Sequence, residues 1–311
     1  MLSRRSVRIK VMQLLYMLNR DEQLTFPDLM KGYNDGIWKT YEIYIFHLYL
    51  LLKVAQYAEK DATIRAAKLL PSDEDKAFTP RLYTNPSLQS LANHVGFLNV
   101  VAQYKSNEDL DDDQIRLMYQ AFSETEEYQK YLELEAPTDQ DNNKILLELY
   151  RFLSTNDLFI EATEDRYNNW QDDESLVVGA MKKTLKVMPL EGEFYREYEP
   201  SDETVREFGE QLLRKTCQED QALFEHIAPN LKNWDADRVA ILDMIMLKMA
   251  LCELLHFPTI PTKVTLNEFV EISKTYSTEN SKDFINGILD RLMKKLIKED
   301  KIVKEGRGLI E

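Results

Sequence analysis

The stretch from residue 258 to residue 292 carries two apolar patterns of helical spacing separated by one polar turn. Pro258 and Pro261 end the apolar run before them, because proline lacks the amide hydrogen that a helix interior requires. Residues 277–281 are mostly short and polar, as in a turn followed by an N-cap. The apolar residues on the two sides of this turn are Leu266, Phe269, Val270 and Ile272, then Phe284, Ile285, Ile288, Leu289 and Leu292. This pattern predicts two amphipathic helices, each packed along one face.

Composition extends this expectation to the whole chain. Its 311 residues exceed the usual size of a single domain, which predicts two domains or one domain with a large insertion. Only 9 glycines and 10 prolines interrupt a sequence rich in helix-forming residues, so we expect an all-α fold. Gly287 lies inside a predicted helix, where Gly costs about 1 kcal/mol relative to Ala, and we expect a close helix–helix contact there.

Charge is distributed unevenly. The formal net charge is −15, and residues 106–175 alone hold 20 acidic and 5 basic side chains. The first 20 residues contain five basic side chains and no acidic one, and residues 291–307 are again basic. The distribution of charge therefore argues against nucleic-acid binding by the middle of the chain but not by its basic ends.

The first predicted helix has a basic start. Its apolar stripe consists of Val7, Val11, Leu14, Leu15 and Leu18. Arg4, Arg5 and Arg8 lie within its first two turns, where cations oppose the helix dipole and gain nothing for folding. A ligand for these arginines is one explanation, and an ordinary solvated basic end is the other.

Three segments are expected along the chain: residues 1–30 as the first helix, 31–195 as an acidic helical insertion, and 196–311 as a C-terminal helical bundle. In the middle segment, helical patterns cover residues 38–57, 91–103, 112–134, 143–153 and 176–187. The aromatic residues of 38–57 suit a buried core better than a base-stacking platform, because only Lys53 is interleaved with them. In the last segment we expect one helix from about residue 202 to 227. A second, from 239 to 256, is apolar nearly all round and belongs at the centre of a bundle.

Several functional classes lack support in the sequence. The chain has no glycine-rich phosphate loop, and Cys217 and Cys252 lack metal-ligand spacing, so we expect no catalytic residue, metal or cofactor. No leader peptide or membrane span is predicted, which indicates a cytoplasmic protein. The four histidines are scattered: His47, His94, His226 and His256.

Two groups of residues resemble the NusB transcription antitermination family. Arg4, Arg5, Arg8, Gln13, Leu15 and Tyr16 fill the pattern RRxxRxxxxQxLY of the first helix in that family. The C-terminal matches are Asp237, Arg238, Leu251, Glu253, Leu254, Pro261, Lys263, Val264, Asn267, Glu268, Asp283, Phe284, Asn286, Gly287, Leu289 and Asp290. Most of residues 25–195 has no counterpart in the pattern. The chain thus resembles a NusB-like pair of helical bundles with an inserted helical region, and residues 1–30 resemble the first helix of the NusB-like core.

The resemblance implies a non-enzymatic factor that binds boxA-type RNA together with NusE, a ribosomal protein, in an antitermination complex on RNA polymerase. The implied RNA contacts are Arg4, Arg5, Arg8, Tyr16, Asn280, Ser281, Lys282 and Phe284. For the partner surface we expect Asp237, near the start of the central helix. The alternative is a helical protein-interaction module that kept the NusB fold, lost RNA binding and uses the insertion to bind a partner.

Overall fold

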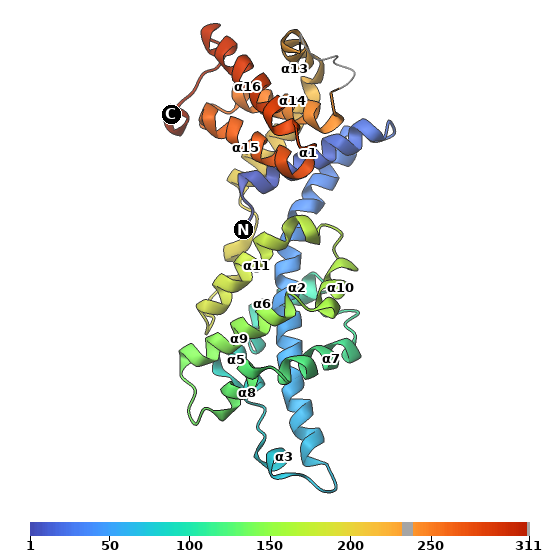
Figure 1. The fold of residues 1–311 in the computed structure, drawn as a ribbon, viewed down its shortest axis with the longest axis vertical. Helices are drawn as coiled ribbons and strands as arrows, with labels where there is room; N and C mark the ends of the chain where they lie inside the picture. The colour runs from blue at the N-terminus through green and yellow to red at the C-terminus, as the bar shows by residue number, and fades with distance from the viewer. Residues whose placement is uncertain (232–238, 310–311) are drawn as a thin grey trace. The chain divides into compact units, whose positions relative to one another are not determined.

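The computed structural model describes residues 1–231 and 239–309. Within these ranges every regular element is a helix and no strand occurs, which confirms the predicted all-α class (Figure 1). The helices up to residue 198 are α1 (Arg4–Arg20), α2 (Phe26–Ala66), α3 (Asp73–Ala77), α4 (Arg81–Thr84), α5 (Pro86–Ala92), α6 (Val95–Gln103), α7 (Asp112–Ser123), α8 (Glu126–Glu133), α9 (Asp139–Leu153), α10 (Asp157–Glu164), α11 (Trp170–Lys186) and η1 (Phe194–Tyr198). Those that follow are η2 (Glu203–Glu210), α12 (Gln211–Gln218), α13 (Asp220–Ile227), η3 (Ala228–Asn230), α14 (Ile241–His256), α15 (Thr262–Tyr276), α16 (Ser281–Lys298) and η5 (Gly306–Leu309).

The chain divides into two compact units, each with its own apolar core. The acidic unit comprises Trp38–Glu199 together with Met1, and the terminal unit comprises Leu2–Ile37 and Pro200–Glu311. The segment boundaries expected after residues 30 and 195 differ from these by a few residues. The first helix, expected over residues 1–30, ends at Arg20. The second helix, α2, begins at Phe26 and contributes residues to both units, which moves the first boundary.

In the terminal unit, α14 is the central helix. It contacts α1, α12, α13, α15 and α16, and its buried residues occur on every side of the helix axis. This confirms the expected position at the centre of a bundle. The two helices predicted from the C-terminal pattern are present as α15 and α16. The single helix expected over 202–227 is instead a π-helix, η2, followed by α12 and α13, with a break at Glu219.

Two glycines of the terminal unit differ sharply in their surroundings. A Cβ atom on Gly209, in η2, would overlap Tyr33 Oη and Val7 Cγ1. Tyr33 cannot easily withdraw, since its hydroxyl donates a hydrogen bond to the Val205 carbonyl at 2.8 Å. At Gly287 the nearest atom to an added Cβ is Arg291 Nη2, a flexible side-chain end at 3.9 Å. The close helix–helix contact expected at Gly287 is therefore wrong, and Gly209 is the glycine that permits one.

Alanine substitution is expected to separate these two positions. Gly209→Ala should lower the free energy of unfolding by about 1–3 kcal/mol, because the methyl group overpacks the contact with Tyr33 and Val7. Gly287→Ala should raise it by up to about 1 kcal/mol, since Ala is the better helix former where there is room. Urea denaturation of the two variants beside the parent chain measures both changes. Equal effects of the same sign would contradict the difference in packing.

The acidic unit has an aromatic core centred on α2. Tyr41, Tyr44 and Phe46 are at most 1% exposed, which confirms the buried-core interpretation of residues 38–57. His47 lies among these rings with both ring nitrogens satisfied, Nδ1 by the Tyr150 hydroxyl at 3.0 Å and Nε2 by Thr163 Oγ1 at 3.1 Å. Burial lowers the pKa of His47 to about 3, so the imidazole is neutral in the folded protein.

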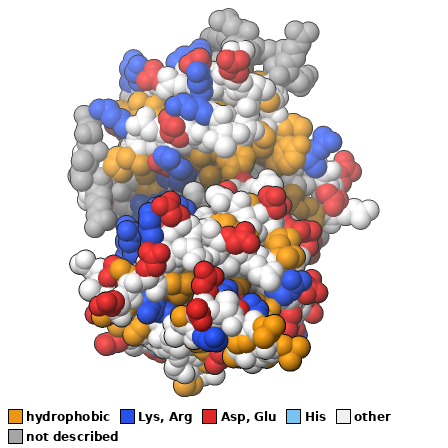
Figure 2. All heavy atoms as spheres, turned by 60° about the horizontal axis from the view of Figure 1, so that its bottom comes forward, with side chains coloured by type: hydrophobic (Ala, Val, Ile, Leu, Met, Phe, Trp, Pro, Cys, Tyr) orange, Lys and Arg blue, Asp and Glu red, His pale blue; other side chains and the backbone are white. Residues whose placement is uncertain are grey.

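Short capped helices make up the rest of this unit. The predicted helix 112–134 is two helices, because Thr125 interrupts the pattern and caps the N-terminus of α8. The predicted helix 91–103 is interrupted in the same way by His94, which caps α6. On the face drawn in Figure 2, acidic side chains recur across the surface with Lys and Arg side chains between them. None of the helices described in either unit is both long and apolar enough to cross a membrane.

Candidate nucleic-acid interface

The basic start of α1 is fixed by a side-chain cap. Ser3 has an extended backbone and its hydroxyl accepts the Ser6 amide hydrogen at 3.2 Å, so the helix begins at Arg4. No acidic residue lies in the first turn of α1. The three arginines of this turn and the next are therefore compensated from other helices, and each one is compensated differently.

Arg8 lies in the interior. Its side chain is 2% exposed, and its Nε and Nη2 atoms each donate to the Glu253 carboxylate of α14 at 2.7 Å. Thr265 Oγ1 donates to the same carboxylate at 2.7 Å, and the guanidinium lies 5.0 Å from the centre of the Phe208 ring. Arg8 was expected as an RNA contact. In the structure it is buried where α1, α14 and α15 meet, and its charge is already paired and shielded from solvent.

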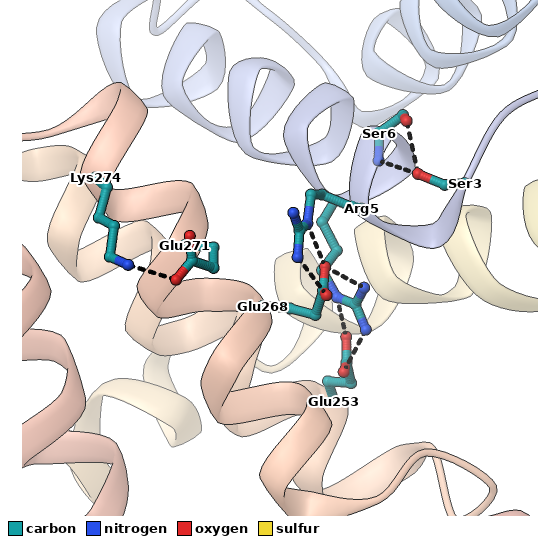
Figure 3. A network of polar contacts seen from close by, with 8 residues as sticks. Ser3, Arg5, Ser6, Glu253, Glu268, Glu271 and Lys274 are labelled. Carbon is teal, nitrogen blue, oxygen red and sulfur yellow. Dashed lines mark hydrogen bonds and ion pairs between the residues drawn. The ribbon is translucent and has the colours of Figure 1, made fainter. Parts of the chain in front are cut away.

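Arg5 faces outward and pairs with α15 (Figure 3). Its Nε and Nη2 atoms donate to the two Glu268 oxygens at 2.8 Å and 2.7 Å, while half of the arginine side chain remains exposed. The hydrogen bond with Arg5 lowers the pKa of Glu268 and raises the pKa of Arg5. Glu268 also lies 3.6 Å from Arg8. One carboxylate therefore links the outward arginine to the buried pair.

Arg4 is the second outward arginine. Its Nη2 atom lies 3.1 Å from Glu203 of η2 in a pair exposed on both sides, and its guanidinium lies 5.6 Å from the Phe208 ring centre. Arg4 and Arg5 border a groove of 390 Å³. Its other lining residues are Ser3, Arg8, Ile260, Pro261, Val264 and Glu268. The groove thus combines an apolar floor with two guanidinium groups at its edge.

The second predicted contact region, at the start of α16, is divided between surface and interior. Asn280 and Lys282 are exposed, whereas Phe284 is half-buried against the core of the terminal unit. Ser281 is 1% exposed and donates to Asp243 of α14 at 2.7 Å, beside a second donation to Asp243 from Ser277 at 2.6 Å. Ser281 therefore holds the loop against α14 instead of facing solvent.

The predicted contacts do not form one cluster. Arg5 meets α15 at Glu268, and the loop before α16 begins at Ser277, so about 12 Å of helix axis separates the two levels. Tyr16 is 38% exposed and lies three turns further along α1 from Arg5. Asp237, the expected partner contact, lies outside the described residues. A ligand that met every predicted position would have to extend along the unit.

Glu253 and Glu268, which hold the arginines, were not predicted as site residues, yet the sequence contains a signal for the buried pair. Arg8 lies three residues before Val11 and seven before Leu15, which is the spacing of one helix face. Glu253 lies in a helix that is otherwise apolar nearly all round. A charge on each of two buried faces requires a partner of opposite sign, so the two residues are natural partners for each other.

The residues that the structure describes include no group of three or more His, Cys, Asp and Glu side chains placed to hold a metal ion. Cys217 and Cys252 are free thiols, and burial raises the pKa of Cys252 to about 12.

Comparison with known proteins gives a consistent assignment. The model of the NusB family matches residues 171–294. The transcription antitermination protein NusB of Salinibacter ruber is 39% identical over 109 residues, which cover 35% of this chain and 68% of that protein. The NusB protein of Chloroherpeton thalassium is 35% identical over 111 residues, covering 36% of this chain and 53% of its own length. The NusB protein of Methylacidiphilum infernorum is 41% identical over 98 residues, which cover 32% of this chain and 68% of that protein.

No solved structure matches the chain significantly. The family model covers α11 to α16 and does not reach α1, so the arginine pattern of α1 is an additional resemblance. Most of the acidic unit likewise precedes the matched residues. Because two NusB proteins are 39% and 41% identical to it over 68% of their own lengths, this all-α chain belongs to the NusB family.

Proposed function

We propose that the terminal unit binds single-stranded, boxA-type RNA together with NusE, in an antitermination complex on RNA polymerase in the cytoplasm. The observation that carries this proposal is the groove beside α1, where Arg4 and Arg5 border an apolar floor. Arginines supply salt-dependent contacts to phosphates, and an apolar floor suits an unstacked base. The printed name of the relatives, transcription antitermination protein, agrees with this role.

In this proposal the three arginines have separate tasks. Phosphate groups compete with Glu203 for Arg4 and with Glu268 for Arg5, since both pairs are accessible to solvent. Arg8 does not contact RNA but holds α1 against α14 and α15 through Glu253. At the start of α16, Asn280, Lys282 and the accessible part of Phe284 extend the RNA path, with Ser281 as the internal support of that loop.

For the protein partner, a second groove of the terminal unit fits best. It measures 460 Å³, lies along α1, α12 and the start of α14, and is lined largely by apolar side chains, among them Leu15, Leu18 and Met244. Lys248 and Asp220 add a charge pair of 2.6 Å at its edge. Ile241, one of its lining residues, is 37% exposed. Val239, which lines this groove, follows Asp237 by two residues in the sequence; Asp237, the residue expected at the partner surface, lies outside the described residues.

The test is binding of a short boxA-like RNA to the full chain, with and without NusE, across a series of salt concentrations. Arg4→Ala with Arg5→Ala should weaken binding at least tenfold. It should also lower the slope of log K against log salt by about 1.4, since each phosphate contact contributes about 0.7 on a single strand. Lys298→Ala with Lys301→Ala removes the same charge from the last residue of α16 and the segment after it, and serves as the control. Equal losses in the two double variants would contradict the site.

A second candidate function rests on one specific observation. Both outward arginines already have carboxylate partners, Glu203 and Glu268. That pairing favours a module that kept the fold and lost RNA binding. Absence of RNA binding by the parent chain at low salt, with NusE present, would support this alternative over the first.

A further inference from the structure

The acidic unit has a groove of its own. Its volume is 580 Å³, and it lies among α2, α7, α10 and the loop between α6 and α7. Apolar side chains form its floor: Phe46, Leu50, Leu110, Ile115, Met118 and Ala162. Charged side chains form its rim: Asp109, Asp111, Asp165 and Arg166. The groove thus combines an apolar base with three carboxylates and one guanidinium.

The guanidinium fixes the loop of the rim. Arg166 Nη1 donates to the Glu108 carbonyl at 2.9 Å, Nη2 donates to the Lys105 carbonyl, and the group lies 5.4 Å from the Phe46 ring centre. Lys105 and Asp109 have φ angles of 54° and 55°, an uncommon left-handed conformation for residues other than glycine. Arg166 therefore holds a loop shape that places Asp109 at the groove, and its own donors are directed to backbone carbonyls.

Acidic side chains dominate the rim. Asp111 accepts the Asp113 amide hydrogen at 2.7 Å as the N-cap of α7. Within residues 1–231 and 239–309, neither Asp109 nor Asp165 forms an ion pair. All three belong to residues 106–175, whose net charge is −15. The groove is therefore negative at its rim and in its surroundings.

This combination selects one kind of occupant. RNA is repelled by the rim, and the described carboxylates do not gather into a group that could hold a single metal ion. Lys and Arg side chains carry a long apolar stem and a charged end, which match an apolar floor and a negative rim respectively. We propose that this groove docks a basic segment of a protein partner, with aliphatic stems on the partly exposed Leu110 and Ala162 and cationic ends against the three rim carboxylates.

The proposed site is independent of RNA binding, because every residue that forms it belongs to the acidic unit. Its contacts are solvent-accessible ion pairs, so the complex should be transient and should weaken with salt. A NusB-family chain with this site would recruit a basic partner through residues that all lie outside the family match.

The first test measures binding of fluorescein-labelled octalysine to the full chain by fluorescence anisotropy at low salt. Asp109→Asn with Asp165→Asn removes two rim charges, and Asn tolerates the left-handed backbone at position 109. This double variant should bind octalysine roughly tenfold more weakly, because each lost ion pair lowers the affinity about threefold to fivefold. Glu124→Gln with Glu135→Gln makes the same change in net charge at exposed positions outside the groove lining and should bind within twofold of the parent.

A second test locates the probe directly. Carbodiimide coupling of octalysine to the full chain, followed by mass spectrometry, should give crosslinks concentrated at Asp109, Asp111 and Asp165. Spermidine, which has the charge but lacks the peptide scaffold, should compete poorly at equal charge concentration. Equal losses in the two double variants, crosslinks spread over the acidic segment, or full competition by spermidine would each overturn the proposal.

Discussion

Replacing Glu253 by Ala is expected to lower the free energy of unfolding of the terminal unit by about 3–5 kcal/mol. The substitution leaves the Arg8 guanidinium 2% exposed and without the carboxylate that accepts two of its hydrogen bonds, and it also removes the acceptor of Thr265. Glu268 remains 3.6 Å from Arg8, but it does not replace the two lost hydrogen bonds, and water cannot reach the buried guanidinium to solvate it. Urea denaturation followed by circular dichroism measures the loss.

Two comparisons make this result specific. Glu203→Ala removes the carboxylate that pairs with Arg4, an exposed arginine on α1, and should lower the free energy of unfolding by less than about 1 kcal/mol. The double variant Arg8→Met with Glu253→Leu removes both charges and should recover most of the stability lost in Glu253→Ala. A loss below 1 kcal/mol in Glu253→Ala, or no recovery in the double variant, would contradict the paired, buried arrangement.

The acidic unit is expected to lose stability in acid through His47. Its pKa is about 3 in the folded protein, because burial disfavours the charged ring, against about 6.5 in an unfolded chain. Between these two values the unfolded state binds one proton more than the folded state. This contribution to stability is therefore complete above pH 6.5 and is lost as the pH falls toward 3, by about 1.4 kcal/mol per pH unit.

The measurement is a series of urea titrations between pH 7 and pH 4 on the parent chain and on His47→Gln. Glutamine can still hydrogen-bond to Tyr150 and Thr163 but takes up no proton in this range. The parent should lose stability faster than the variant as the pH falls, whatever the carboxylates contribute to both. His94→Gln should keep the steep profile of the parent. Parallel profiles for the parent and His47→Gln would contradict a neutral, buried His47.

Periodicity and proline positions were sufficient to predict the helices that a bundle requires. The central position of α14 followed from its lack of a polar face, and α15 and α16 followed from the turn at residues 277–281. The breaks at His94, Thr125 and Glu219 were missed because the apolar pattern continues on both sides of each. These breaks depend on single capping residues and local packing, which a pattern averaged over several turns does not resolve.

The candidate site was less predictable for a different reason. Sequence resemblance selects residues by type, but it does not say whether a charged side chain faces solvent or another helix. Arg4 and Arg5 lie on the surface and Arg8 in the interior, although all three belong to one basic cluster. Ser281 similarly faces Asp243, which lies 38 residues earlier in the chain. Such long-range pairing is decided by the packing of α1 and α16 against α14.

The burial of Arg8 has a practical consequence for handling the protein. At 1 M salt the Debye length falls to about 3 Å, which weakens contacts between solvent-exposed charges but hardly affects a pair excluded from water. Under the proposed function, nucleic acid that co-purifies on Arg4 and Arg5 should therefore be removed by a high-salt wash that leaves the Arg8–Glu253 pair, and with it the packing of α1, intact. Protein treated in this way should be free of nucleic acid and still folded, and is therefore suitable for the binding measurements.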